Sequence, residues 1–209
     1  MIGFPTPRVL LLSALGLLVS GAFTGCGNTP FGKDTRNKMI VSVNDQKLLL
    51  VHDGNPVKTY KISTSKFGIG DRPNSNCTPL GRLQVAKKIG GGTAIGSVFK
   101  NRRPTGEVIK PNAPGRDPVV TRILWLRGTE SRNQNAYRRT IYIHGTPEEH
   151  RLGRPASFGC IRMSSRDVAD LYNRVGYSAD VFIIRSSIQS KKANPGSSAL
   201  ASNSAHPRI

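Results

Sequence analysis

Two residues of the sequence, His144 and Cys160, have the types and the spacing that nucleophilic catalysis needs. They lie 16 positions apart, and each has a glycine beside it, Gly145 after the histidine and Gly159 before the cysteine. A thiol is a useful nucleophile only as its thiolate, and a nearby imidazole and backbone N–H groups can lower its pKa below the usual value of about 8.5. A glycine next to a reactive side chain lets a substrate backbone come close. We therefore expect Cys160 to be a nucleophile and His144 its base.

Arg162 follows the cysteine by two residues and adds a fixed positive charge to the candidate site. Other cysteine sites differ in order or spacing: papain-like enzymes place the cysteine before the histidine, and sortase-like enzymes spread cysteine, histidine and arginine along the chain. A metal site built from His144, His150 and Cys160 would need a further ligand, and the intervening residues set no helical ligand spacing. We therefore expect neither a metal nor another cofactor.

The segment around these residues resembles the catalytic motif of the L,D-transpeptidase (YkuD-type) family. It reads His144-Gly-Thr-Pro and then Ser157-Phe-Gly-Cys-Ile-Arg-Met, where the family has His-Gly-Thr followed by Ser or Thr, His, Gly and Cys, with Arg or Asn soon after. The segment Thr78-Pro-Leu-Gly is similar to the family's Thr-Pro-x-Gly element. One position departs from the pattern, because Phe158 stands where the family usually has histidine and supplies no side-chain donor.

The resemblance implies a cysteine acyltransferase of the bacterial cell wall. Cys160 matches the nucleophile and His144 the base, which the carbonyl of Gly145 would orient. N–H groups near Gly159 and Cys160 would form the oxyanion hole, and Arg162 would support the site or bind substrate. The substrates would be peptidoglycan stem peptides, joined by transfer from a tetrapeptide stem to an amine.

Two alternatives to cross-linking stay open at this point. Water as the acceptor would make the protein an L,D-carboxypeptidase, and some family members attach a protein to the wall instead. The departure at Phe158 also leaves room for a non-catalytic wall-binding lipoprotein.

Five residues near the motif are candidates for contact with the stem peptide. They are Tyr142, Thr146, Ser157, Phe158 and Trp125. Trp125 is the single tryptophan of the chain, and packing in the core is the alternative role for it.

Short strands must position these residues. Alternating or β-branched segments at 39–43, 47–52, 57–63, 82–89, 119–126, 139–144 and 180–185 predict strands, and tight turns between the first three predict an antiparallel meander. In the strand at 139–144, Ile141 and Ile143 share one face, so Tyr142 and His144 point to the other. Residues 100–118 are rich in proline and basic side chains, which predicts a long loop.

One helix is expected after the cysteine. Ser164 can cap it, and Val168, Leu171 and Val175 give it an apolar stripe, with Gly176 at its end. The chain is therefore mostly β, and the resemblance implies a β-sandwich or open barrel with one or two short helices.

The N-terminus has the form of an export signal. A basic start with Arg8 precedes an uncharged Leu-rich segment at 9–23, which is too short for a comfortable membrane span. Small residues before Cys26 resemble a lipobox, although Phe23 departs from its usual leucine; a cleaved signal without lipid and an uncleaved anchor are the alternatives. We expect a signal at 1–25, a tether at 26–37, a catalytic domain at 38–186 and a disordered tail at 187–209.

The charge is strongly positive, with 31 Lys and Arg against 12 Asp and Glu and a net charge of +19. Such a charge suits nucleic acid, but an exported protein meets anionic cell-envelope polymers instead, and plain solubility is a third explanation. We expect a monomer in the periplasm or envelope, held on the wall by charge and by a lipid anchor if Cys26 is lipidated. Cys77, the third cysteine, is expected to be a structural or idle thiol, and a redox lock with Cys160 is an alternative.

Overall fold

The computed structural model describes residues 32–188, which all lie in one compact unit. The signal segment, Cys26 and most of the expected tail lie outside the described residues. Within residues 32–188 no helix is long and apolar enough to span a bilayer.

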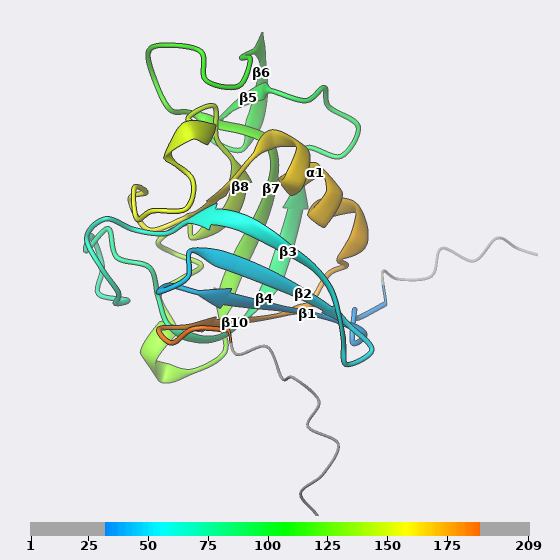
Figure 1. The fold of residues 1–209 in the computed structure, drawn as a ribbon, viewed down its shortest axis with the longest axis vertical. Coiled ribbons are helices and arrows are strands. Elements are labelled where there is room, and N and C mark those ends of the chain that lie inside the picture. The colour runs from blue at the N-terminus through cyan, green and yellow to red at the C-terminus, as the bar shows by residue number, and fades with distance from the viewer. Residues whose placement is uncertain (1–31, 189–209) are drawn as a thin grey trace, which may run out of the picture. The chain divides into compact units, whose positions relative to one another are not determined.

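Residues 32–188 form ten strands, one α-helix and two short 3₁₀ helices. Figure 1 shows how these elements are arranged. In chain order they are β1 (Asn37–Ser42), β2 (Lys47–His52), β3 (Asn55–Ser63), β4 (Gly81–Ile89), β5 (Ser97–Lys100), β6 (Arg103–Val108), β7 (Val119–Gly128), η1 (Ser131–Asn133), β8 (Tyr142–Gly145), η2 (Glu149–Arg151), β9 (Ile161–Met163), α1 (Ser165–Arg174) and β10 (Asp180–Ile184).

The strands form one sheet in the order β4-β10-β1-β2-β3-β9-β8-β7-β5-β6, and an additional pairing of β4 with β7 closes it. The mostly β fold class expected from the sequence is confirmed, as is the meander, because β1, β2 and β3 pair antiparallel. The strands β8 and β9 pair in parallel, with His144 opposite Arg162. This pair of strands brings the two halves of the sequence motif side by side.

The core has two parts, and they correspond to the two faces of β8. Ile143 and Ile161 are fully buried in the larger cluster, together with residues of β1, β2, β3, β7 and α1. Tyr142 belongs to a smaller cluster on the other face. The predicted opposite facing of isoleucines and site residues is therefore confirmed.

Helix α1 begins as the sequence predicts. The Ser164 side chain accepts a hydrogen bond from the N–H of Asp167, and Val168 and Leu171 are fully buried. The helix packs against β7 and β8. Its N-terminus follows directly after β9, the strand that carries Arg162.

Two expectations about local structure are wrong. The segment 100–118 is not one long loop, because β5 and β6 form a hairpin around Asn101 and Arg102, whose φ angles are +51° and +67°. All of β6 is exposed, so it has no apolar alternation to reveal a strand. The strand expected from 139 starts only at Tyr142, because Thr140 has a φ of +55° and cannot continue an extended chain.

Candidate active site

Cys160 lies in a tight turn directly before β9, and hydrogen bonds hold this turn on both sides. The Ser157 hydroxyl donates to the carbonyl of Cys160 at 2.6 Å and accepts from the N–H of Gly159 at 3.2 Å. The buried Thr78 hydroxyl donates to the carbonyl of Gly159 at 2.9 Å. Gly159 has a φ of +121°, which favours glycine, and a Cβ there would lie 3.3 Å from the carbonyl oxygen of Cys77. Ser157 thus shapes the turn, and the N–H of Gly159 is already engaged with it.

The thiol of Cys160 has backbone partners from the chain entering β8. Its Sγ donates to the carbonyl of Thr140 and accepts from the N–H of Tyr142, each at 3.4 Å. Burial raises the pKa of this thiol to about 11, while the Tyr142 N–H and the charges of Arg139 and Arg162 act in the lowering direction. The lowered thiol pKa expected from the sequence is therefore wrong, because burial outweighs the favourable partners.

His144 is also buried, on the same face of β8 as Tyr142. Its Nδ1 lies 2.8 Å from the carbonyl oxygen of Gly145. A carbonyl can only accept, so Nδ1 carries the proton and Nε2 of the neutral ring is the acceptor. Burial lowers the pKa of His144, and the positive charge of Arg162 adds to this effect. The imidazole is thus neutral at pH 7, in the tautomer that a general base needs.

Gly145 permits the close approach that this arrangement requires. A Cβ at Gly145 would lie 2.7 Å from the carbonyl oxygen of Val120 in β7 and 3.2 Å from a methyl group of Val168 in α1. A larger residue would push β8 away from both neighbours. The sequence marks Gly145 by its place next to His144, and the structure shows in addition that close packing between β7 and α1 requires a glycine there.

Arg162 is almost fully buried, and its charge is balanced by two carboxylates. It pairs with Asp117, from the loop before β7, and with Glu148 at 3.0 Å. Thr146, also buried, donates its hydroxyl to Asp117 and accepts from the N–H of Glu148. Thr146 thus orients the partners of Arg162, and its contacts are with the protein's own acids.

The aromatic candidates divide into a packed group and an exposed group. Trp125 stacks on Tyr137 with ring centroids 4.2 Å apart, and its indole N–H donates to the Tyr137 carbonyl. Tyr142 meets Trp125 edge to face at 5.6 Å and His144 at 6.5 Å. Trp125 is therefore a core residue that supports the site from behind.

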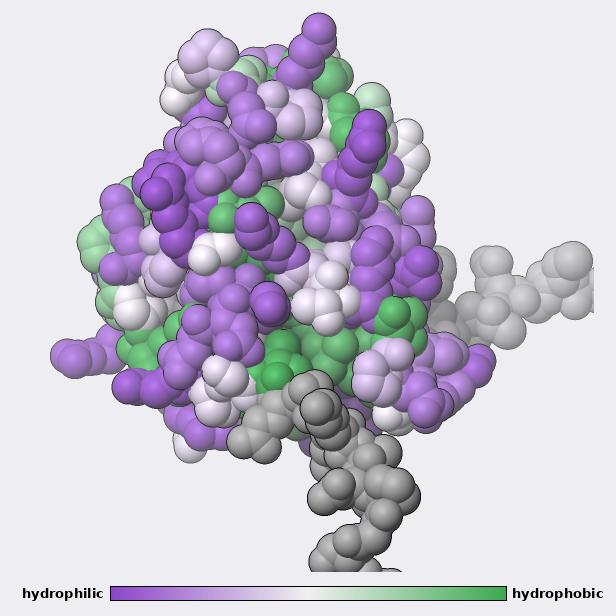
Figure 2. All heavy atoms as spheres, viewed as in Figure 1, coloured by the Kyte–Doolittle hydropathy of each residue, from purple (hydrophilic) through white to green (hydrophobic). Residues whose placement is uncertain are grey.

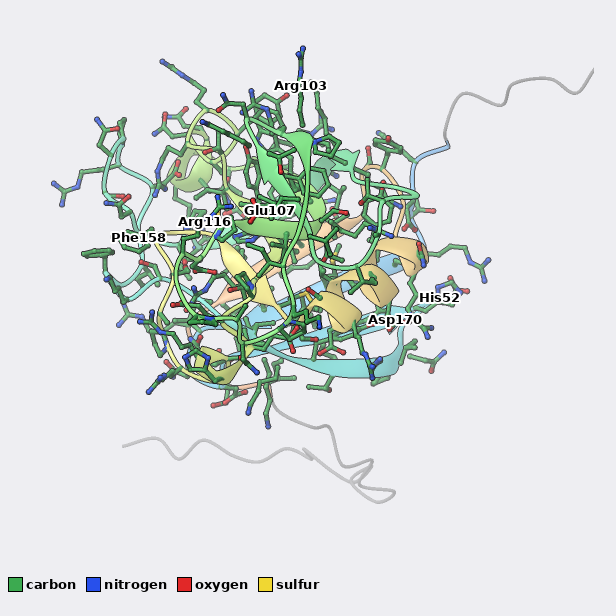
Figure 3. All side chains as sticks on the ribbon, turned by 90° about the horizontal axis from the view of Figure 1, so that it is seen from above. His52, Arg103, Glu107, Arg116, Phe158 and Asp170 are labelled. Carbon is green, nitrogen blue, oxygen red and sulfur yellow. The ribbon has the colours of Figure 1, made fainter. Side chains whose placement is uncertain are left out.

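Phe158, in contrast, is 64% exposed and projects from one side of the molecule (Figure 3). Its ring lies 5.4 Å from that of Phe67, which is 49% exposed, and the ammonium of Lys66 lies over both rings. The residue that replaces the family's histidine thus forms part of an exposed aromatic pair beside the cysteine. On the face seen in Figure 2, hydrophilic side chains predominate, with smaller hydrophobic areas between them.

One cavity is lined by the cysteine, and a second lies near it and shares Thr140 as a lining residue. The first, of about 220 Å³, is lined by Cys160 itself and by Asn74, Asn76, Arg139, Thr140, Ile141 and Phe158. The second, of about 300 Å³, is lined by Phe99, Asn101, Arg102, Val119, Ile123, Thr140 and Tyr142. Cys160 also packs against the cluster that contains Phe99 and Tyr142. The thiol therefore lies where the two cavities approach one another.

The structure adds residues that the sequence analysis did not single out as site residues. Arg139 is buried in an ion pair with Asp71 at 2.8 Å and donates to the carbonyl of Cys77, which ties the 68–78 loop to the site. Thr140 contributes a carbonyl and Asp117 a carboxylate. The sequence carries Arg139 only as part of a basic run, and no local pattern marks the other two.

Among residues 32–188, the side chains of Cys77, His52 and His150 have partners other than Cys160 and His144. Cys77 and Cys160 are both free thiols, and Cys77 donates to the carbonyl of Phe67 at 3.2 Å. The ring of His52 contacts Asn37, and that of His150 contacts Asn112. Among residues 32–188 no group of three or more His, Cys, Asp or Glu side chains could hold a metal ion.

The fold and the motif together define a class of protein. The family model of the L,D-transpeptidase catalytic domain (YkuD) matches residues 36–183, which is well over half of the 209 residues. The chain therefore belongs to the L,D-transpeptidase catalytic-domain family. No curated protein matches it significantly.

Solved L,D-transpeptidases are among the structures that resemble this one. L,D-transpeptidase 3 from Mycobacterium tuberculosis is 19% identical with a TM-score of 0.47, over 72% of this chain and 61% of that one. The enzyme from Xylanimonas cellulosilytica is 18% identical with a TM-score of 0.45, over 74% and 64%. A cysteine-to-serine mutant from Enterococcus faecium is 17% identical with a TM-score of 0.46, over 71% and 50%. The chain thus spans less than two thirds of each of these solved chains.

Proposed function

We propose that this protein is a cysteine L,D-transpeptidase that cross-links peptidoglycan stems. The observation that carries the proposal is a neutral, buried His144 on β8, oriented by the Gly145 carbonyl, with Cys160 in the turn directly before β9, the strand that pairs in parallel with β8. A base with this tautomer and a thiol on the same face are the parts that thiol acyl transfer needs.

The reaction takes place in two acyl transfers. His144 accepts the thiol proton as the sulfur of Cys160 attacks the carbonyl of the L-centre of diaminopimelate. The C–N bond to D-Ala then breaks, the departing amine takes the proton from His144, and a thioester remains. A second stem's amine attacks the thioester, the C–S bond breaks, and the surplus amine proton returns through His144 to the sulfur. The overall reaction exchanges one amide for another and needs no cofactor.

The resting site holds no charge on either reacting group, because burial raises the pKa of Cys160 and lowers that of His144. The thiolate therefore forms as the substrate reacts, with Arg162 and Arg139 supplying nearby positive charge. Backbone N–H groups of the 159–160 turn are the proposed oxyanion donors. For the N–H of Gly159 this requires exchange of its bond to Ser157.

The presence of two cavities near the sulfur fits a substrate with an acyl part and an amine part. The acyl part of the donor stem would occupy one cavity, and the other would take the leaving D-Ala and then the acceptor amine. Hydrolysis would use both cavities as well, so analysis of the products distinguishes it from transfer. The cavities lined by Phe158 and by Phe99 share Thr140, whose carbonyl contacts the Cys160 sulfur. Two stems could thus approach this sulfur from different sides.

The test is incubation of the purified protein with disaccharide tetrapeptide and mass analysis of the products. We expect release of D-Ala and formation of a cross-linked dimer, both lost in Cys160→Ala and both retained in the matched control Cys77→Ala. D-Ala release without dimer would instead indicate the carboxypeptidase. Neither product, with Cys160→Ala indistinguishable from the parent, would defeat the enzymatic function and favour a wall-binding role.

We also propose that the protein works outside the cytoplasm, on anionic wall polymers. The signal-like segment, the lipobox-like residues before Cys26 and the net charge of +19 support this. Metabolic labelling with a radioactive fatty acid, compared between the parent and Cys26→Ala, tests the anchor. Fractionation of cells tests the compartment.

A further inference from the structure

The cavity on the Tyr142 side contains a cation that the proposed mechanism does not use. Arg102 stands in the turn of the β5–β6 hairpin and lines this cavity. Its guanidinium carbon lies 4.9 Å from the centroid of the Trp125 ring, and one N–H reaches the Tyr142 hydroxyl at 3.5 Å. An arginine stacked on an aromatic face is held in place while most of its N–H groups stay available.

The acids nearest in sequence are already committed to other cations. Segment 100–118 has two acidic residues, and Glu107 pairs with Arg116 while Asp117 pairs with Arg162 (Figure 3 labels the first pair). For Arg102 the described part of the chain shows the long hydrogen bond to the Tyr142 hydroxyl and the contact with Trp125. The cavity therefore offers a positive charge suited to a carboxylate from a ligand.

The other cavity also has an arginine, but its hydrogen bonds are taken. Arg139 is paired with Asp71 at 2.8 Å and also donates to the carbonyls of Gly70 and Cys77. Its role is to hold the 68–78 loop. The two cavities thus differ in one chemical respect, a cation that is free to bind an anion on the Arg102 side.

The chemistry of the proposed reaction calls for a site that binds a carboxylate next to the reacting amine. The leaving D-Ala carries a carboxylate on the carbon that bears its amine. The acceptor amine, at the D-centre of diaminopimelate, has the same arrangement. Attack by the acceptor is the reverse of departure by D-Ala, so both must use the same side of the Cys160 thioester. A single cation there would serve both groups.

We propose that Arg102 is a specificity-determining residue which binds the carboxylate beside the leaving and the attacking amine. The enzyme would then select amines with an adjacent carboxylate, of D-amino-acid type, over simple amines or amidated ones. The proposal rests on the proposed function, since it assigns one cavity to the amine partner of that reaction. The Tyr142 backbone joins this cavity to the nucleophile, because its N–H donates to the Cys160 sulfur.

The test compares D-methionine and D-methioninamide as acceptors, with disaccharide tetrapeptide as the donor. Exchange products are measured by mass spectrometry at several acceptor concentrations. For each variant, the kcat/KM for D-methionine is divided by the kcat/KM for D-methioninamide. The two amines differ in basicity, but this difference is the same for every variant and cancels when the ratios are compared. We expect Arg102→Gln to lower the acid-to-amide ratio roughly tenfold, as loss of one charge-assisted contact predicts.

The matched control is Arg103→Gln, on the same hairpin and with the same change of charge. Arg103 is exposed and extends away from the body of the molecule (Figure 3), so we expect it to leave the ratio unchanged. Arg102→Lys should retain part of the preference. An Arg102→Gln enzyme that forms both products with the parent's ratio would overturn the proposal. Absence of D-Ala release and of product in the parent itself would instead reject the proposed function.

Discussion

At the scale of single residues, the site rests in an uncharged state. Burial raises the pKa of Cys160 to about 11 and lowers that of His144, so the thiol and the imidazole are both neutral at pH 7. A preformed thiolate–imidazolium pair would need the opposite shifts. In the proposed mechanism, charge then develops only with substrate in place, where Arg139 and Arg162 would stabilise it.

This resting state predicts the pH dependence of alkylation. The rate for Cys160 with iodoacetamide should keep rising above pH 9, because a raised pKa means that the thiolate fraction grows until the pH reaches about 11. Digestion and mass spectrometry would follow the Cys160 peptide separately from those of Cys26 and Cys77. A Cys160 rate that levels off below pH 8 would contradict the buried neutral thiol.

The buried position of Arg162 leads to a second residue-scale prediction. Arg162→Met removes one charge from a group with Asp117 and Glu148 and leaves two partly buried carboxylates without it. We expect a loss of about 3 kcal/mol in the free energy of unfolding, typical of breaking a buried pair from one side. Urea unfolding measures this.

The double variant Arg162→Met/Asp117→Asn separates charge from packing. If the ion pair carries the effect, the double variant should lose less stability than the sum of the two single variants. Additive losses would show that Arg162 acts through packing alone.

The sequence singles out His144 and Cys160 as candidate catalytic residues, because each stands in a short local motif. It does not predict Arg139, Thr140 or Asp117 as site residues. Each of these reaches the site through hydrogen bonds to distant segments: Arg139 through Asp71, Thr140 through the Cys160 sulfur, and Asp117 through Arg162. Such partners depend on how the chain folds back, which no local spacing encodes.

At the scale of elements, predictability follows from burial. Helix α1 is predicted because its buried side chains repeat with the helical period and Ser164 caps it. The strand β6 is missed because all its residues are exposed. The hairpin turn before β6 has positive φ angles at Asn101 and Arg102. Turns of this kind usually contain a glycine, and the absence of one here leaves the turn without its usual sequence signal.

The attachment of α1 to β3 should be sensitive to acid. Asp170 accepts from the Tyr60 hydroxyl at 2.8 Å and pairs with Lys58 and Arg174. Although burial acts in the raising direction, these partners together lower its pKa to about 2. A lowered folded-state pKa gives stability that is present above the unfolded value of about 3.9 and is lost as the pH falls toward 2.

Asp170→Asn tests this attachment. We expect a loss of about 1–2 kcal/mol at pH 6, discounted for the partial exposure of the group, and a smaller difference at pH 3. Urea unfolding at pH 6, 4 and 3 gives the comparison. Asp167→Asn on the same helix is the control, because its carboxylate lies 3.9 Å from Lys58 and should matter less. An Asp170→Asn difference that does not change with pH would argue against the ion pair.

At the scale of the whole molecule, long-range pairing of strands brings the parts of the candidate site together. The pairing of β4 with β7 and the parallel pairing of β8 with β9 join segments that are far apart in the sequence. The first cavity is lined by loop residues alone, and the second by residues of β5, β7 and β8 together with the hairpin turn and Thr140. Alternating patterns predict that strands exist, but the order of strands, and with it the second cavity, follows from long-range packing.

The proposed role of the net charge of +19 belongs to this scale as well, because the wall polymer that it would attract is larger than the protein. Binding to isolated sacculi should weaken as salt rises from about 50 to 300 mM, since the screening length falls below about 10 Å over this range. The exposed residues Lys100, Arg103 and Lys110 supply part of this charge without lining the cysteine cavity. Changing all three to Glu should reduce sedimentation with sacculi while D-Ala release from a soluble stem stays near that of the parent. Binding that is insensitive both to salt and to these changes would show that the wall is recognised by shape, and the positive charge would then serve solubility.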